Sequence, residues 1–221
     1  MNKTGIFLTT FNLLEKTKKT LISLAQNTTD YELVVVDNNS TDGTQQWIKD
    51  QGIPIIEFNQ QTDLTVALNA GIRHFFNKES EENGVFYDVC WIHNDMTFYD
   101  GWLKTLKQYF EDHPECAKVA PHNMRDPIAP ERSGNELPCL IRNHVLKQIG
   151  LYDERYIGIG GREDWDLNNR IIDNNWTVMI TPESKVYHEG MATRKLVNTD
   201  ADAGYNSNIY FQKWGTYDAR V

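Results

Sequence analysis

The feature that most constrains the fold is a run of apolar β-branched residues in the first quarter of the chain. Residues 31–37 read YELVVVD, and three consecutive valines, Val34 to Val36, leave no polar position on either face of a strand. A strand that is apolar on both faces is typical of a parallel sheet covered by helices, because a half-exposed antiparallel strand alternates apolar and polar residues. The run therefore predicts an α/β fold with a buried sheet.

Strand and helix patterns alternate around this run. Further strands are predicted at residues 5–10, 53–58 and 87–93, and helical spacing of apolar residues occurs at 13–26, 44–51, 64–77 and 101–113. This alternation indicates a single Rossmann-like, mostly parallel sheet with helices on both faces. With 221 residues, the chain is expected to form one domain.

The second half of the chain carries weaker patterns. The proline-rich stretch 114–138 is predicted to be loop and edge structure, and residues 140–149 a short apolar element. A helix is expected at 164–174, closing strands at 176–180 and 185–188, and a partly helical tail from residue 201.

Charge and cysteine content exclude some classes of protein. The chain has 22 basic and 31 acidic residues, a formal charge of -9, which disfavours nonspecific binding to nucleic acid. Its three cysteines are widely separated and form no zinc or disulfide pattern, so a reduced, cytoplasmic location is expected. No signal peptide or membrane anchor is expected, since every apolar run is too short.

Short polar residues follow four successive predicted strands. The carboxyl ends of parallel strands meet at one edge of a sheet, where such folds bind ligands. Each group has a plainer reading as a turn or helix cap, and that reading is at least as common. The polar candidates are Thr9, Thr10, Asn12, Asp37, Asn38, Asn59, His93, Asn94 and Asp95.

One of these groups is a candidate metal site. His93 and Asp95 stand two residues apart where a strand gives way to a loop, and His188 ends a late strand. A hard divalent ion needs only one or two protein carboxylates when substrate phosphates supply its other ligands. A solitary histidine is more often structural, so the case for His188 depends on its neighbours.

The densest carboxylate cluster follows a glycine-rich stretch. Glu163, Asp164 and Asp166 come directly after Gly160, Gly161 and Arg162, at the start of a predicted helix. Acidic residues favour the first helical turn because of the helix dipole. The functional alternative is a mobile loop that closes over a substrate while one carboxylate acts as a base. Trp165 is either a platform for a sugar ring or a core residue.

The ordered set of segments resembles the family-two glycosyltransferases, an inverting group with the GT-A fold, over residues 5–193. ELVVVDNNSTDGT is similar to the signature whose aspartate contacts the nucleoside, here Asp37, and FNQQTDLTVALNAGI places Asn59, Asn69 and Gly71 near the donor. WIHNDMTF stands at the Asp-x-Asp metal motif, with His93 replacing the first acid and Asp95 matching the second.

Two later segments extend the resemblance. GREDWDLNNRI is similar to the Glu-Asp motif whose aspartate is the general base, here Asp164, and VYHEGMAT to the segment whose histidine joins the metal, here His188. The Gly-Gly-x-Glu-Asp order also resembles a loop of the β-1,4-galactosyltransferases, apart from the inserted Arg162. Gly160, Gly161, Glu163, Trp165 and Asp166 are then expected at the acceptor site.

The resemblance implies an inverting transferase that moves a sugar from a nucleotide diphosphate donor to an acceptor hydroxyl with Mn2+ or Mg2+. UDP is the expected nucleotide, with dTDP second, and the acceptor is a glycan, a lipid-linked molecule or another hydroxyl compound. Residues 1–100 would form the nucleotide-binding half and residues 101–221 the acceptor-binding and catalytic half, in a GT-A fold with a smaller acceptor-side region. Two alternatives stay open, a non-catalytic nucleotide-sugar-binding module of the same fold and a sugar nucleotidyltransferase.

Overall fold

The computed structural model describes residues 2–81, 84–125, 138–190, 192, 196 and 200–218. Within these residues the strands form one curved sheet in the order β3-β2-β1-β4-β7-β6-β8-β5. The strands are β1 (Lys3–Thr10), β2 (Glu32–Asp37), β3 (Ile55–Glu57), β4 (Tyr87–His93), β5 (Met96–Phe98), β6 (Cys116–Asn123), β7 (Cys139–Ile141) and β8 (Thr177–His188).

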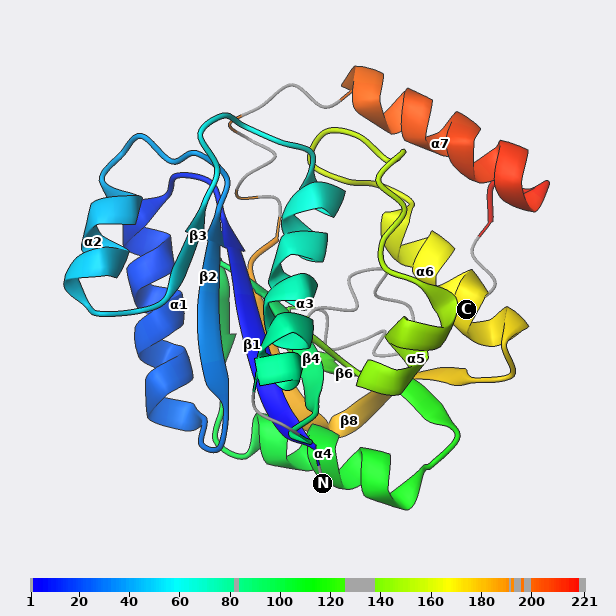
Figure 1. Ribbon diagram of the computed structural model, residues 1–221, viewed down its shortest axis with the longest axis horizontal. Helices are drawn as coiled ribbons and strands as arrows, with labels where there is room; N and C mark the ends of the chain where they lie inside the picture. Colours follow the sequence, from blue (N-terminus) through cyan, green and yellow to red (C-terminus); the bar gives the residue numbers. More distant parts are fainter. Residues whose placement is uncertain are drawn as a thin grey trace.

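Helices cover both faces of the sheet (Figure 1). The helices are α1 (Leu14–Asn27), α2 (Thr44–Asp50), α3 (Leu64–Glu81), α4 (Trp102–Asp112), α5 (Asn143–Ile149), α6 (Glu163–Asp173) and α7 (Asp200–Trp214). One apolar cluster joins the sheet to α1, α2 and α4. A second joins its other face to α3, α5 and α6. The predicted α/β class with a mostly parallel sheet is confirmed.

The valine run occupies the interior as predicted. Val34, Val35 and Val36 are each 0–1% exposed. They alternate between the two apolar clusters, with Val35 in the first and its two neighbours in the second. β2 pairs in parallel with β1 and β3, and β1 in parallel with β4. The carboxyl ends of these four strands therefore lie along one edge of the sheet.

The prediction of loop and edge structure at 114–138 is wrong for β6, whose residues are all buried and which lies inside the sheet. A buried lysine and a proline interrupt the apolar pattern by which this strand would be predicted. Lys118 is 2% exposed and donates a hydrogen bond of 2.9 Å to Asn168. Pro121 lies at a shift of register against β8, where a missing N–H is tolerated. Residues 126–137 of the predicted loop lie outside the described residues.

Two other boundaries differ from the sequence patterns. Residues 140–149 divide into β7 and α5, and the two closing strands are one strand, β8, of 12 residues. β5 was not predicted, because three residues are too few to show a period. It pairs antiparallel with β8, and Met96 is opposite His188. This pairing brings the loop after β4 to the end of β8.

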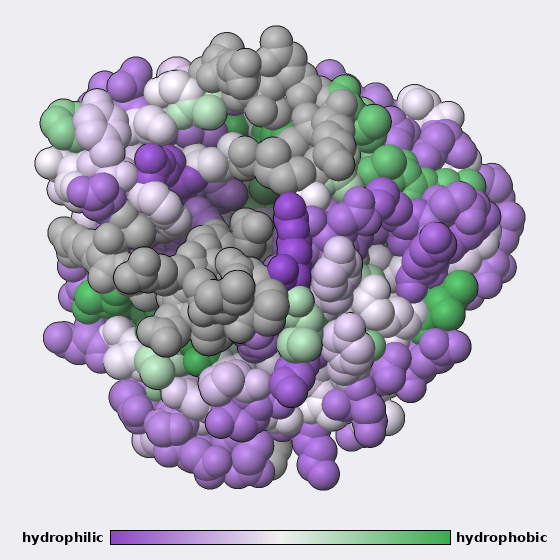
Figure 2. Space-filling view, turned by 180° about the vertical axis from the view of Figure 1, so that it is seen from behind, coloured by the Kyte–Doolittle hydropathy of each residue, from purple (hydrophilic) through white to green (hydrophobic). Residues whose placement is uncertain are grey.

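On the side turned away in Figure 1, most of the surface that the described residues expose is hydrophilic (Figure 2). Among the helices of the described residues, none combines the length and apolarity that crossing a bilayer requires.

Glu32, at the start of β2, has a lowered pKa, from which we expect the protein to lose stability in acid. Burial raises the pKa of Glu32, but hydrogen bonds from Lys78, Tyr87 and Lys3 outweigh it and lower the pKa from 4.5 to about 2. A lowered folded-state pKa contributes stability that is complete above the unfolded value and is lost as pH falls toward the folded value.

We expect Glu32→Gln to lower the free energy of unfolding at neutral pH by about 1 kcal/mol, a value reduced for screening of a partly exposed group. Urea unfolding of both proteins should show this difference shrinking between about pH 5 and about pH 3. A difference of unchanged size at the lower pH would contradict the assignment.

Candidate active site

A cavity of about 460 Å³ opens at the carboxyl ends of β1 and β4. The ends of these strands and of β8 line it on one side, and the glycine-rich loop with the first turn of α6 on the other. The sequence-predicted residues that line it are Thr9, Thr10, Asn38, His93, Asn94, Asp95, Gly161, Glu163, Asp164, Trp165 and His188. The structure thus brings most of the candidates into one space.

The candidate metal ligands form one cluster. One ligand atom each from His93, Asp95 and His188 lies within 4.8 Å of the others. His93 is the last residue of β4, Asp95 lies in the turn that follows, and His188 is the last residue of β8. The pairing of β5 with β8 explains why Asp95 and His188, which are far apart in the sequence, lie side by side. A hydrogen bond from Glu189 N to Asp95 O, 3.0 Å long, extends this pairing.

The buried atoms of this cluster fit a divalent ion. Asp95 Oδ1 and both ring nitrogens of His188 are buried, and within the described residues none makes a hydrogen bond. His188 Nε2 and Asp95 Oδ1 are 3.1 Å apart without hydrogen-bond alignment. Two ligands at right angles on one octahedral ion, each about 2.1 Å from it, would be about 3 Å apart. Burial raises the pKa of Asp95, but His188 and His93 outweigh it, and the net shift is downward.

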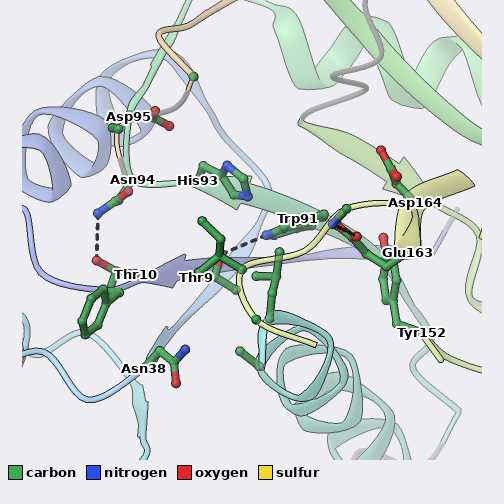
Figure 3. A pocket seen from close by; sticks show the side chains of 18 of the residues that line it. Thr9, Thr10, Asn38, Trp91, His93, Asn94, Asp95, Tyr152, Glu163 and Asp164 are labelled. Atoms are coloured by element: carbon green, nitrogen blue, oxygen red, sulfur yellow. Dashed lines mark hydrogen bonds between the residues drawn. The ribbon is translucent and has the colours of Figure 1, made fainter. Parts of the chain in front are cut away.

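Other polar side chains at the strand ends hold loops together. Asn94 is 3% exposed and donates to Thr10 Oγ1 at 3.0 Å and to Asn12 O at 3.1 Å. Trp91 Nε1 donates to Thr9 Oγ1 at 3.0 Å (Figure 3). These hydrogen bonds hold the ends of β1 and β4 in a fixed position relative to each other, so the cavity floor is preorganised.

Asp37, the residue before Asn38, is not among the residues that line the cavity. It is fully buried, and its Oδ1 accepts hydrogen bonds from Ser40 N at 2.8 Å and Gln45 Nε2 at 2.6 Å. Its Oδ2 is buried without a hydrogen-bond partner in the described residues. Asn38, next in the chain, does line the cavity and is held by Thr62.

Asn59, Asn69 and Gly71, which were also expected near the donor, do not line the cavity. Asn59 lies on an exposed bend. Asn69 is buried and exchanges hydrogen bonds with the backbone of Tyr152, both at 2.9 Å. Gly71 faces the ring of Phe7, and a Cβ there would lie 2.4 Å from that ring. The structure therefore gives Asn69 and Gly71 packing roles, for which an amide and a missing side chain are sufficient. Asn12 and Gly160 also lie outside the lining.

The carboxylates after the glycines have separate surroundings. Glu163 is 6% exposed and accepts a hydrogen bond from Gly161 N, which closes the loop on itself. Asp164 lines the cavity, accepts from Trp165 N at 2.8 Å, and points away from the Glu163 carboxylate (Figure 3). Asp95 lies on the opposite side of the view from Asp164. Two acidic centres thus face each other across one cavity.

Asp166, which was expected at the acceptor site, is not among the residues that line the cavity. It is fully buried beneath α7, where Trp214 Nε1 at 2.9 Å and Lys213 Nζ at 2.7 Å contact its Oδ1, and Arg170 Nε contacts its Oδ2 at 3.0 Å. The i, i+4 spacing to Arg170 was visible in the sequence. The contacts from α7 were not, because they join residues far apart in the chain.

We therefore expect Asp166→Asn to destabilise the protein. Asn cannot pair with Arg170 and Lys213, which keep other partners in backbone carbonyls and Asp153, so the loss of these charged hydrogen bonds should cost about 2 kcal/mol. Urea unfolding at neutral pH measures this loss. Unchanged stability combined with weaker use of an acceptor would contradict the structural role and restore the expected one.

Several cavity residues carry no sequence signal of function. Trp91 and Tyr152 have the pattern of apolar core residues, Lys118 lies in β6, which has no clear strand pattern, and Arg162 is an insertion in the Gly-Gly-Glu-Asp order. The tail helix α7 also holds the loop before the glycines, since Asn206 exchanges hydrogen bonds with Ile157 N and O at 2.8 and 2.9 Å. Side chains of this kind become candidates only once the fold places them.

A family profile described as Glycosyl transferase family 2 matches residues 6–164. The chain belongs to this family. The match spans β1, the Asp37 and Asp95 segments and the start of α6. A search of curated protein sequences gives no significant match.

Solved glycosyltransferases of low sequence identity share the fold. Mannosyltransferase PcManGT from Pyrobaculum calidifontis, in complex with GDP-Man and Mn2+, aligns with a TM-score of 0.68 at 17% identity, over 84% of this chain and 56% of that one. TarS 1-349 of S. aureus, in complex with UDP, aligns with a TM-score of 0.65 at 16% identity, over 95% of this chain and 70% of that one. The present chain therefore has the GT-A fold, and it spans 56% of the length of the mannosyltransferase.

Proposed function

We propose that this glycosyltransferase moves a sugar from a nucleotide diphosphate donor to an acceptor hydroxyl, with inversion at the anomeric carbon. The single observation that carries the proposal is the position of Asp164 across one cavity from the cluster of Asp95, His93 and His188. One centre suits a diphosphate with its counterion, and the other suits the removal of a proton.

Asp95 and His188 would hold a divalent ion, with His93 as a weaker third ligand. A bound Mn2+ or Mg2+ would supply positive charge for the diphosphate. The remaining donor contacts would come from the cavity floor, with Asn38, Thr9 and Thr10 as candidates. Asp37 would contact the nucleoside through its unpartnered Oδ2, which requires the base to enter behind the present lining.

Asp164 would accept the proton of the acceptor hydroxyl as that oxygen forms its bond to the anomeric carbon. A base is needed because a neutral hydroxyl is a poor nucleophile, and a base within reach contributes about 10²- to 10⁴-fold to such steps. Attack on the face opposite the leaving nucleotide inverts the configuration. Trp165, Gly161 and Glu163 would shape the acceptor side of the cavity.

The division into donor and acceptor halves is also part of the proposal. Residues 1–100 would hold the nucleotide and residues 101–221 the acceptor, with one exception. His188 belongs to the second half but lies in the metal cluster. We expect the protein to work in the cytoplasm and UDP to be its nucleotide. The structural neighbours bind GDP-Man with Mn2+ and UDP, so both nucleotides belong in the test.

Isothermal titration calorimetry with UDP-, GDP- and dTDP-sugars tests the donor site, each measured with Mn2+ and with EDTA. One nucleotide should bind at least about tenfold more tightly with the metal, because the ion offsets the repulsion between a diphosphate and acidic residues. If no donor binds in the presence of Mn2+ or Mg2+, the proposed function is wrong.

A further inference from the structure

Arg162 lines the cavity beside the proposed base and has an unusual backbone. It lies immediately before α6 with a φ of 78°, a left-handed conformation that side-chain-bearing residues rarely adopt. Such strain persists at sites where the surrounding structure enforces it. It precedes Asp164 by two residues and lines the same cavity, so it belongs to the Asp164 side of the cavity and not to the metal cluster.

Aromatic rings hold the Arg162 guanidinium. Its Cζ lies 3.9 Å from the centroid of Trp165 and 5.8 Å from that of Tyr210 on α7. The two rings pack edge to face, with centroids 5.9 Å apart. Stacking on an aromatic face favours the cation and fixes the plane of the guanidinium. The side chain is therefore preorganised without a carboxylate partner.

The positive charge of Arg162 is not met by the described part of the chain. Its Nη1 is buried without a hydrogen-bond partner, and the described residues offer the guanidinium no ion pair. Each of the other arginines among them has a carboxylate or carbonyl partner. These are Arg73, Arg125, Arg142, Arg155 and Arg170.

This contrast points to a ligand. The chain has 31 acidic against 22 basic residues, so a shortage of acidic partners does not explain why this arginine is unpaired among the described residues. An unpaired buried donor is costly unless something else satisfies it. The planar guanidinium suits phosphate and carboxylate groups best.

We propose that Arg162 receives an anionic group, phosphate or carboxylate, carried by the acceptor close to its reacting hydroxyl. The inference rests on the proposed function, which places the donor diphosphate at Asp95 and His188 and leaves the Asp164 side to the acceptor. An acceptor of this class would be a sugar phosphate, a phosphodiester-linked polymer or a uronic acid. Neutral glycans would use the site poorly.

The test is calorimetric and uses simple probes. The protein is first saturated with Mg2+ and UDP, or with GDP or dTDP if UDP does not bind, and this step alone shows whether the proposed donor site exists. Glycerol 3-phosphate and glycerol are then titrated into the saturated protein, into Arg162→Gln, and into the control Arg155→Gln. Arg155 is exposed, is paired with Asp153 and lies outside the cavity lining. A further arm compares UDP-glucuronate with UDP-glucose as donors.

We expect wild type and Arg155→Gln to bind glycerol 3-phosphate at least about tenfold more tightly than glycerol, and Arg162→Gln to lose that preference. Equal binding of the two probes by wild type, or an unchanged preference in Arg162→Gln, would overturn the proposal. If Arg162→Gln weakens only UDP-glucuronate, the anion belongs to the donor sugar and the acceptor assignment is wrong. Unchanged UDP binding in Arg162→Gln shows that the variant is folded.

Discussion

Asp164→Asn should lower kcat for sugar transfer by about 10²- to 10⁴-fold while leaving the donor dissociation constant unchanged. The amide has the shape of the carboxylate but cannot accept the proton of the acceptor hydroxyl. Donor affinity should persist because the diphosphate is expected on the other side of the cavity, at Asp95 and His188. The measurement is the steady-state rate of transfer together with a donor titration of the same preparation.

Asp50→Asn is the matched control for this experiment. Asp50 is exposed at the end of α2 and lies outside the cavity lining, so the same chemical change there should leave kcat unaltered. Transfer by Asp164→Asn at a rate within a few-fold of wild type would show that Asp164 is not the base. Glu163, whose carboxylate is bound to Gly161 N, would then be the next residue to test.

Asp95→Ala should abolish the metal dependence of donor binding. Asp95 is the carboxylate of the metal cluster, and its Oδ1 is buried without a hydrogen bond within the described residues. Without it, only two imidazoles remain, and imidazole is a poorer ligand than carboxylate for Mg2+ and Mn2+. We expect the donor dissociation constant in Mn2+ to rise at least about 100-fold, since even supporting residues of metal sites contribute about 10- to 100-fold.

We expect His188→Ala and His93→Ala to weaken donor binding to different extents. His188 has both ring nitrogens buried without a hydrogen bond in the described part of the chain, so its loss should weaken donor binding more than the loss of His93. The His93 ring packs edge to face on Trp91, with centroids 4.7 Å apart, which suggests a packing role as well. Titration of Mn2+ followed by electron paramagnetic resonance measures ion binding directly. Equal Mn2+ affinity in wild type and Asp95→Ala would contradict the site.

The sequence was sufficient for the elements with strong local patterns. In β2, α1 and α3 the buried residues are apolar and recur with the spacing of a strand or a helix. The kind of element and its approximate ends can therefore be predicted from the sequence alone. β6 was missed because its buried positions include Lys118 and Pro121. These residues are tolerated only through a partner on α6 and a bulge against β8.

The candidate site shows the same division. Asp95 and His188 were expected to lie together, and the pairing of β5 with β8 explains how, although no local pattern revealed β5. Asp166 and Asp164 belong to the same acidic cluster, and only the contacts of α7 show that one is buried and the other faces the cavity. Tertiary partners, which a sequence pattern does not contain, decide between two neighbouring carboxylates.

The most direct test of glycosyl transfer by this protein is 31P NMR of a bound nucleotide sugar incubated with the protein and Mg2+. We expect nucleoside diphosphate to appear, and to appear faster when an acceptor is present. Asp164→Asn should bind the donor without producing nucleoside diphosphate. A donor that binds and stays intact would indicate a binding module. Conversion of the donor and pyrophosphate into sugar 1-phosphate and nucleoside triphosphate would indicate a nucleotidyltransferase. Either result would contradict the proposed transfer.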